Sequence, residues 1–263
     1  MSEYQNFPAA LQRQIEDDIT SGILSADQIV RVEDLCGQFQ VSIEDIQLVI
    51  PSLERKALIK KNTDESIQIL GVYKAAIESV FQYAEKSKLK PRTIVRSVTV
   101  VPAEDLIAKI LWMSPGDPLY VQVRTRMVDD QILANQYNFI PYEVCPGLEE
   151  VDLSRSSFQV TLEKIFHTVI ARIEETYNLN HPERDDREIL SITKDQPVLV
   201  IQRTSFSRNE FPLVFADIHV NPALFHYVKD LWPRHFHWLD LSRKGIEYQL
   251  IFNLLSINSN IRP

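Results

Sequence analysis

Glycine and cysteine are both scarce in this chain. Only six of its 263 residues are glycine, which leaves little room for a glycine-rich phosphate loop, and no such loop, nucleophile elbow or zinc signature is present. Cys36 and Cys145 stand far apart and lack the spacing of a metal or redox motif, so we expect reduced thiols. The sequence therefore offers no catalytic residues, no metal site and no cofactor, and predicts that the protein is not an enzyme.

Long hydrophobic runs are absent as well. No apolar stretch approaches the roughly 18 residues that a membrane span needs. The first 14 residues mix polar and charged side chains and do not read as a signal peptide. A composition of 44% hydrophobic and 24% charged residues is typical of a globular protein. We expect a cytoplasmic protein of two domains with no membrane partner.

Basic residues are few in the N-terminal segment. Residues 1–70 hold twelve acidic and six basic side chains, which leaves a local charge of −6 within a total of −8. A domain that reads DNA gains most of its affinity by neutralising phosphates. This charge balance therefore argues against tight DNA binding by the N-terminal segment.

The hydrophobic pattern of the same segment nevertheless predicts a winged helix-turn-helix. A first helix ends near Gly22, a second spans 32–39, and segments 57–61 and 66–70 can pair as a hairpin. The apolar stripe of the first helix is Leu11, Ile15, Ile19 and Ile23.

A third helix follows a turn at Val41-Ser42. Ser42 is placed as its N-cap, with Asp45 at the capping-box position. Pro51 lies about nine residues into this helix, where it removes a backbone hydrogen bond and clashes with the preceding turn. We expect a kink or an early break there.

The rest of the chain contains an internal repeat. A shift of 79 residues aligns two units that each read as helix, proline-containing turn, strand, polar turn and strand. The aligned pairs are Ile110-Leu111 with Ile189-Leu190, Ser114 with Thr193, Pro118 with Pro197, Val121 with Val200, and Arg124-Thr125 with Arg203-Thr204. Two such units predict a mostly antiparallel sheet of about six strands, with helices packed on one side.

The predicted fold class is therefore α+β, a winged helix-turn-helix followed by the six-stranded sheet with helices. We expect domain boundaries at 1–70 for the winged helix and 71–90 for a connecting helix. Residues 91–230 form the predicted sheet domain. Residues 231–263 are a C-terminal extension with an apolar helical pattern.

Arginines recur on one face of the predicted sheet. Tyr120, Gln122, Arg124 and Arg126 alternate with apolar residues, and the repeat places Arg203 on the matching face. Guanidinium groups suit carboxylate or phosphate, so a cleft lined by these arginines would bind an anionic metabolite. The alternative is that they pair with carboxylates on neighbouring strands.

Two other groups of polar residues do not make convincing sites. Glu174 and Glu175 are adjacent in a strand and point to opposite faces, so they cannot act together as acid and base on one substrate. The histidines at 226, 235 and 237 lack a nearby cysteine or a fixed third ligand, which argues against a metal site.

Several of these segments resemble regulators of the GntR type, HutC branch. Residues 14–24 resemble their first helix, 35–42 their second helix and turn, and 54–60 their closing segment. Residues 90–227 resemble the UTRA effector-binding domain, whose fold is shared with chorismate lyase. The resemblance implies a homodimeric, ligand-responsive transcriptional regulator that binds DNA through the winged helix.

The departures from this family fall on DNA-contacting positions. Glu33 stands where a phosphate contact is expected, and the recognition helix reads Ser42-Ile43-Glu44-Asp45-Ile46-Gln47 instead of the family's arginine-containing pattern. The wing, 62–66, is acidic rather than basic. The DNA-binding residues that remain as candidates are Arg31, Ser42, Gln47, Lys60 and Lys61.

In the effector domain the Arg124-Thr125-Arg126 strand and the preceding Arg92-Thr93 match the family. Gln136 replaces a glutamate, while Val214 and Asp217 replace a later glutamate and arginine, so a sugar-phosphate site would be altered. The predicted ligand-binding residues are Arg92, Thr93, Arg124, Arg126, Gln136, Tyr137, Glu174 and Arg203.

The sequence thus predicts a ligand-responsive transcriptional regulator that binds a small anionic metabolite, with weakened DNA binding. Two alternatives stay open. The chain is a metabolite sensor or protein-interaction module derived from this family, or, less favoured, an enzyme of the chorismate-lyase kind.

Overall fold

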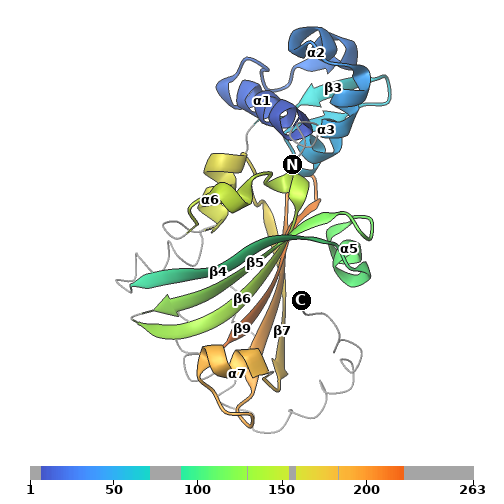
Figure 1. The fold of residues 1–263 in the computed structure, drawn as a ribbon. Helices are drawn as coiled ribbons and strands as arrows, with labels where there is room; N and C mark the ends of the chain where they lie inside the picture. The colour runs from blue at the N-terminus through green and yellow to red at the C-terminus, as the bar shows by residue number, and fades with distance from the viewer. Residues whose placement is uncertain (1–6, 72–89, 129, 154–157, 183, 222–263) are drawn as a thin grey trace.

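The computed structural model describes residues 7–71, 90–128, 130–153, 158–182 and 184–221. Residues 7–71, here called the head, form a small unit at one end of a large β-sheet (Figure 1). The expected connecting helix over 71–90, apart from its two end residues, and the expected extension over 231–263 lie outside the described residues. The predicted domain boundaries stay predictions.

The head has the architecture of a winged helix-turn-helix, as the sequence predicted. Its small sheet is antiparallel in the order β1-β3-β2. The strand β1, which pairs with β3, was not predicted. The elements are α1 (Phe7–Ser21), β1 (Ile29–Arg31), α2 (Val32–Phe39), α3 (Ile43–Arg55), β2 (Ile59–Lys61) and β3 (Ser66–Ile69).

The apolar stripe of α1 is shorter than the sequence predicted. Leu11, Ile15 and Ile19 are buried, but Ile23 is 65% exposed. The helix ends at Ser21, and Gly22 follows with φ +84°, a conformation that glycine adopts readily. The turn redirects the chain, so Leu24 is buried in place of Ile23.

The start of α3 is confirmed. Of the kink or early break expected at Pro51, the early break is wrong. Ser42 caps the helix through a complete capping box with Asp45. Pro51 lies inside α3, which continues to Arg55. Leu53 and Arg55 in the last turn are buried, and this packing compensates for the hydrogen bond that proline removes.

The large sheet has six strands, and every pair of neighbours is antiparallel. The strands are β4 (Pro91–Pro102), β5 (Pro118–Val128), β6 (Gln131–Pro141), β7 (Arg172–Asn180), β8 (Val198–Phe206) and β9 (Pro212–Val220). Their order is β4-β5-β6-β9-β8-β7. The helices are α5 (Asp105–Leu111), α6 (Phe158–Phe166) and α7 (Arg184–Leu190).

The internal repeat is visible in this order. The helix α5 spans 105–111 and α7 spans 184–190, so the two are displaced by the predicted 79 residues. The units β4-α5-β5-β6 and β7-α7-β8-β9 meet at the β6–β9 pair, and the strand order reads the same from either edge. The sheet is therefore built from two similar halves.

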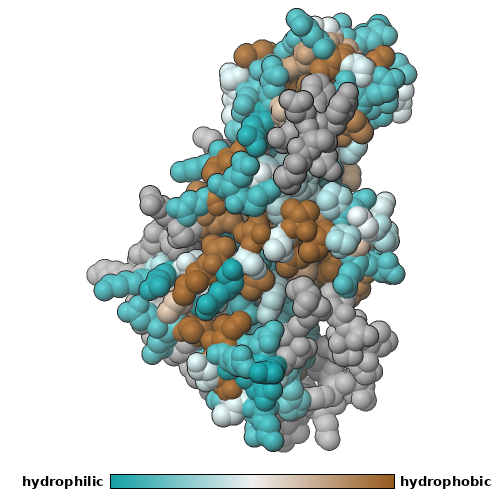
Figure 2. All heavy atoms as spheres, in the orientation of Figure 1, coloured by the Kyte–Doolittle hydropathy of each residue, from teal (hydrophilic) through white to brown (hydrophobic). Residues whose placement is uncertain are grey.

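The helices cover both faces of the large sheet rather than one. Tyr120 and Ile140 pack with α6, whereas Leu119 and Val121 pack with α5. Neighbouring residues of a strand point to opposite faces, so these two clusters lie on opposite sides of the sheet. The apolar residues alternate less strictly than the prediction assumed, and both faces need cover. Figure 2 shows hydrophobic surface gathered over the middle of the sheet.

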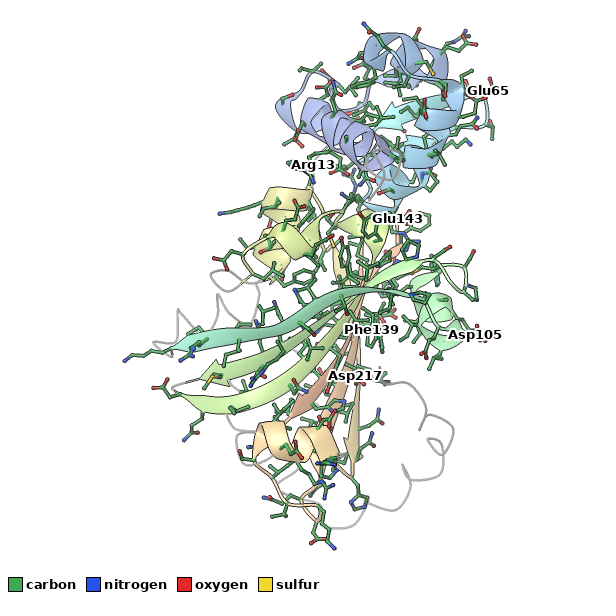
Figure 3. The ribbon with its side chains drawn as sticks, in the orientation of Figure 1. Arg13, Glu65, Asp105, Phe139, Glu143 and Asp217 are labelled. Atoms are coloured by element: carbon green, nitrogen blue, oxygen red, sulfur yellow. The ribbon has the colours of Figure 1, made fainter. Side chains whose placement is uncertain are left out.

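A buried histidine fastens α7 to the sheet. His219 of β9 lies 2.7 Å from Asp186 of α7 through Nδ1 and 3.3 Å from Asp217 through Nε2. Asp217 and Phe139 lie on the sheet face that carries α5 and α7 (Figure 3). Burial by itself would lower the pKa of His219, but hydrogen bonds and charge from the two aspartates raise it to about 9.

We expect this cluster to make stability depend on pH. Because the folded-state pKa of His219 lies above its unfolded value of about 6.5, the contribution is complete below about pH 6.5 and is lost as pH rises through about 9. Urea unfolding of the protein and of His219→Gln, each measured across this range, checks the prediction. A stability difference between them that does not shrink with rising pH would contradict it.

Among the described residues, no helix is both long and apolar enough to cross a membrane.

Candidate ligand-binding site

One face of the large sheet carries three arginines, and we call it the arginine face. Arg124 and Arg126 come from β5, and Arg203 comes from β8. Arg124 stands opposite Gln136 of β6, and Gln136 stands opposite Ile218 of β9. Ile218 in turn stands opposite Ile201 of β8, which lies two residues before Arg203 and shares its face. The register therefore places all three guanidinium groups on the face that α6 covers.

Arg203 is neutralised within the sheet. Its Nε donates to Glu175 of β7 at 2.5 Å, and its Nη2 also contacts that carboxylate. The Tyr177 hydroxyl donates to Glu175 as well. Burial, together with the adjacent carboxylate, raises the pKa of Tyr177. This half of the arginine face is a closed structural ion pair.

Arg124 has no such partner. It is 2% exposed, and its Nε and Nη1 make no hydrogen bond. The residue opposite on β4 is Val95, and the guanidinium carbon lies 5.5 Å from the centre of the Phe158 ring at the start of α6. Burial and the charge of Arg126 hold the pKa of Arg124 well below its usual value. A buried, unpaired cation of this kind is costly in the absence of an anion.

The neighbours of Arg124 add further donors. Arg126 donates to the Thr93 hydroxyl at 2.9 Å, and its pKa is lowered to about 10 by burial and by the charge of Arg203. Gln122 is fully buried. Its side-chain carbonyl oxygen accepts a hydrogen bond from Asn138, whereas its Nε2 has no hydrogen-bond partner. Gln122 and Arg124 lie two residues apart on the same face.

The structure does not bring all the predicted ligand residues together. Thr93, Arg124, Arg126, Gln136 and Arg203 share the arginine face.

Arg92, Tyr137 and Glu174 point to the opposite face, because each stands one residue from a member of the arginine face in an alternating strand. Glu174 is exposed and pairs with Arg172 at 2.5 Å, so its neighbour Glu175 is the acidic residue of the arginine face. These three side chains therefore point away from the arginine face, and their role in ligand binding stays a prediction.

The sequence placed Gln122 on this face but did not predict it as a ligand-binding residue, and it missed Asn138 and Glu175 as members of the face. For Gln122 the strand alternation with Arg124 was a usable signal. For Asn138 the usable signal was its position two residues after Gln136 in the same strand. For Glu175 there was none, because cross-strand register depends on turns and bulges that the sequence does not specify.

The predicted DNA-binding residues lie on the surface of the head. Arg31, Ser42, Gln47, Lys60 and Lys61 are all exposed.

The exposed positions of α3, the recognition helix of this architecture, carry no cation. They are Ile43, Glu44, Gln47, Leu48 and Pro51. The wing residue Glu65 adds negative charge at the far end of the head (Figure 3). This surface has few groups that could contact phosphate.

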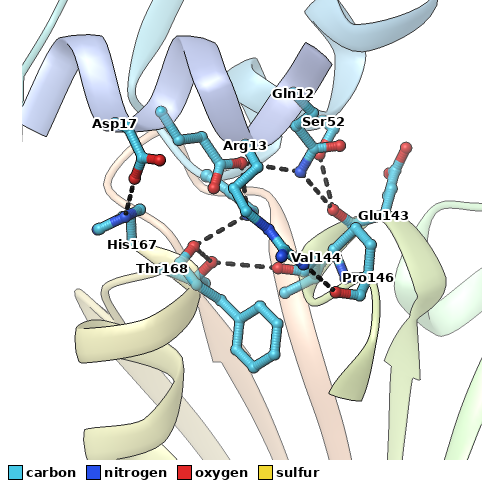
Figure 4. A network of polar contacts seen from close by, with 12 residues as sticks. Gln12, Arg13, Asp17, Ser52, Glu143, Val144, Pro146, His167 and Thr168 are labelled. Atoms are coloured by element: carbon cyan, nitrogen blue, oxygen red, sulfur yellow. Dashed lines mark hydrogen bonds and ion pairs between the residues drawn. The ribbon is translucent and has the colours of Figure 1, made fainter. Parts of the chain in front are cut away.

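A dense set of polar contacts joins the head to the sheet, and we call it the seam. Arg55, at the end of α3, bonds Glu143 at 2.6 Å and the carbonyls of Leu111 and Pro212 at 2.8 Å. Nearby, Ser52 and Gln12 donate to the Glu143 carbonyl, and Arg13 donates to that of Pro146 (Figure 4).

A second part of the seam contains a buried ion pair. Lys56 Nζ lies 2.6 Å from Glu16, with side chains 0% and 4% exposed, and 2.9 Å from the carbonyl of Phe166 at the end of α6. Beside it, His167 contacts Asp17 (Figure 4).

The turn between β8 and β9 completes the seam. Asn209 donates to the carbonyls of Glu54 and Ile59, and Arg208 donates to that of Ala57.

Comparison with known proteins agrees with this architecture. The family model described as the UTRA domain matches residues 86–226, more than half of the chain. The chain belongs to the UTRA-domain family. The match includes all six strands of the large sheet and the whole arginine face, so the candidate ligand-binding site lies within the UTRA domain.

Curated relatives of this UTRA protein are transcriptional regulators. It is 24% identical over 208 residues to the uncharacterized HTH-type transcriptional regulator YurK of Bacillus subtilis, a match covering 77% of this chain and 86% of YurK. It is 18% identical to the HTH-type transcriptional regulator GgaR of Escherichia coli K12, covering 81% and 86%. The expected assignment to a family of ligand-responsive regulators is confirmed.

A solved structure matches the head and the UTRA domain together. The crystal structure of PhnF from Mycobacterium smegmatis superposes with a TM-score of 0.53 at 15% identity, covering 81% of this chain and 95% of PhnF. At this identity the likeness shows the fold, and it supports the α+β class with a six-stranded antiparallel sheet.

Proposed function

We propose that this regulator responds to a small anionic metabolite bound on the arginine face, with Arg124 as the principal contact. The observation that carries the proposal is the difference between the two equivalent arginines. Arg203 has Glu175 as its counter-ion, whereas Arg124 has none and retains two unpaired donors. The same fold thus provides an internal example of what a purely structural arginine requires.

The unpaired groups define the chemistry of the ligand. Arg124 Nε, Arg124 Nη1 and Gln122 Nε2 are all donors, and none is exposed to water in the described structure. A carboxylate or phosphate oxygen accepts such hydrogen bonds and neutralises the guanidinium. Arg126 and Gln136 would complete the site on either side.

A thermal-shift screen of phosphorylated sugars, amino acids and fatty acids tests this proposal. A bound effector raises stability by mass action, by about 2.7 kcal/mol at a hundred times its Kd. We expect anionic compounds to stabilise the protein and neutral analogues of the same size to have no effect. A hit that stabilises Arg124→Met equally well would show that it binds elsewhere.

DNA is the partner that the relatives suggest for the head, and we propose that its binding is weak and rests on few phosphate contacts. Arg31, Lys60 and Lys61 are the exposed cations predicted for this role. With three contacts the logarithm of the binding constant should fall with that of salt concentration at a slope of about −2.7 for each head.

A salt titration with random and promoter-derived duplexes measures this slope. The double variant Lys60→Ala, Lys61→Ala should reduce the slope by about 1.8 for each head. An unchanged slope would show that these lysines do not contact DNA. Absence of any binding at low salt would favour the alternative of a metabolite sensor that does not bind DNA.

We propose that the chain forms the predicted homodimer. The hydrophobic surface over the sheet in Figure 2 supports this, because apolar surface patches are typical of protein–protein interfaces.

A further inference from the structure

The helix α6 connects the proposed ligand site to the head. Its first residue, Phe158, lies under the Arg124 guanidinium, and its last residue, Phe166, accepts a hydrogen bond from Lys56 of the head. The two residues are the ends of a nine-residue helix and lie about 12 Å apart along its axis. A rigid element therefore touches an unpaired arginine at one end and the head at the other.

We propose that Lys56 is the positioning residue through which occupancy of the arginine face changes the placement of the head. The inference rests on the proposed anion site for its trigger and on the seam for its transmission.

The trigger follows from competition for one guanidinium. In the structure, Arg124 stacks on Phe158 through a cation–π contact, which is worth about 0.5–2 kcal/mol. A charge-assisted bond to an anion is stronger and directional. An anion that draws Arg124 into a new position removes the support of Phe158, and the N-terminal end of α6 repacks.

The seam has two parts: some of its contacts join the head to the sheet, and others join the head to α6, so a movement of α6 can reach the head. Arg55 and Asn209 attach the head to segments that adjoin the sheet strands, namely Leu111, Pro212 and the β8–β9 turn. These bonds form a fixed pivot. Lys56 instead attaches the head to α6, where its positive charge also complements the C-terminal end of the helix dipole.

The ion pair makes this attachment stiff. Lys56 is fully buried between Glu16 of α1 and the Phe166 carbonyl, and the Glu16 carboxylate is also held by Gln12 at 2.8 Å. Separating Lys56 from either partner would leave a buried charge unsatisfied. When α6 is displaced, Lys56 and α1 therefore move with it, and the head turns about Arg55.

Spin-label distance measurements on the full chain test the proposal. Labels at Glu33→Cys in the head and Lys109→Cys on α5, both exposed positions, report head placement in a Cys36→Ser background, and labelled protein is diluted with unlabelled protein. The anion probe is inorganic phosphate. The double variant Glu16→Gln, Lys56→Met removes the Lys56 attachment without leaving a buried charge, and Lys194→Met, at an exposed position of the UTRA domain, is the matched surface control.

We expect phosphate to raise the melting temperature of all three proteins but to shift the distance distribution only in the parent and in Lys194→Met. A shift that persists in the double variant would overturn the proposal. A rise in melting temperature with no shift in the parent would also overturn it, while leaving the ligand site intact.

A second arm works without ligand and separates the two proposals. Arg124→Ala keeps only the Cβ of the side chain and cannot reach Phe158, so it removes the support of α6 directly. We expect it to shift the distance distribution in the parent but not when combined with Glu16→Gln, Lys56→Met. If phosphate neither stabilises nor shifts the parent, the anion site fails for this probe, and this arm alone decides the coupling. If the Arg124 substitution does not shift the distance distribution in the parent background, the proposed coupling is rejected.

Discussion

Arg124→Met is expected to abolish effector binding and, at the same time, to stabilise the ligand-free protein. The guanidinium is buried without a counter-ion, and replacing a buried charge by an apolar side chain of similar volume stabilises by about 1–4 kcal/mol in comparable cases. Methionine also keeps a favourable contact with the Phe158 ring. Loss of the principal ionic contact should weaken effector binding at least about a hundredfold.

The internal repeat supplies a matched control for this prediction. Arg203→Met removes the equivalent arginine but leaves the Glu175 carboxylate buried and without its cation. We expect it to destabilise the protein by about 3–5 kcal/mol. Urea unfolding of the two variants, with effector titration by calorimetry, measures both effects. If the two substitutions shift the free energy of unfolding in the same direction, the asymmetry on which the proposed site rests is contradicted.

Lys56→Met is expected to be among the most destabilising single substitutions in the head. It leaves Glu16, whose side chain is 4% exposed, as a buried carboxylate without its cation, and the Phe166 carbonyl loses its donor. Breaking one partner of a buried ion pair costs about 3–5 kcal/mol. Urea unfolding monitored by circular dichroism measures this loss.

Two variants show whether the loss has this cause. Adding Glu16→Gln to Lys56→Met should recover most of the stability, because the neutral amide can still bond Gln12. Lys60→Met, on the exposed wing, should change stability by no more than about 0.5 kcal/mol. A double variant as unstable as Lys56→Met alone would mean that the packing of the lysine stem, and not its charge, holds the seam.

Much of the fold followed from local pattern. The 3.6-residue spacing of buried residues in α1 and α2 and the Ser42 cap are each contained within a short window of sequence, and the 79-residue repeat is visible when two segments of the sequence are aligned. They predicted the winged helix and the six-stranded sheet. The failures were at ends and turns, as with Ile23 and Pro51, where packing against distant segments decides how far a helix continues.

The seam could not be predicted. Arg55 and Lys56 read as ordinary surface cations at the end of a helix, but their partners come from 40 to about 160 residues away along the chain. Nothing in the sequence specifies that the backbone carbonyls of Leu111, Pro212 and Phe166 will accept hydrogen bonds from these two residues. Only the docking of the head on the sheet creates these contacts and buries both charges.

The arginines show most directly where sequence ends and structure begins. Strand alternation placed Arg124 and Arg126 on one face, because a two-residue period is a local property of extended chain, and the internal repeat placed Arg203 on the matching face. Which arginine would be left unpaired was decided by register. In the second half Glu175 stands opposite Arg203; the residue 79 positions earlier is Arg96.

An irregularity between Val95 and Ser97 changes the pairing in the first half. Arg96 is turned to the other face, where it bonds Thr125, and Val95 faces Arg124. A bulge of this kind is set by the twist and pairing of the whole sheet. The sequence by itself thus determined that this protein has an arginine face. The tertiary structure decided that Arg124 is the unpaired cation on it, because only the assembled sheet sets which residue stands opposite.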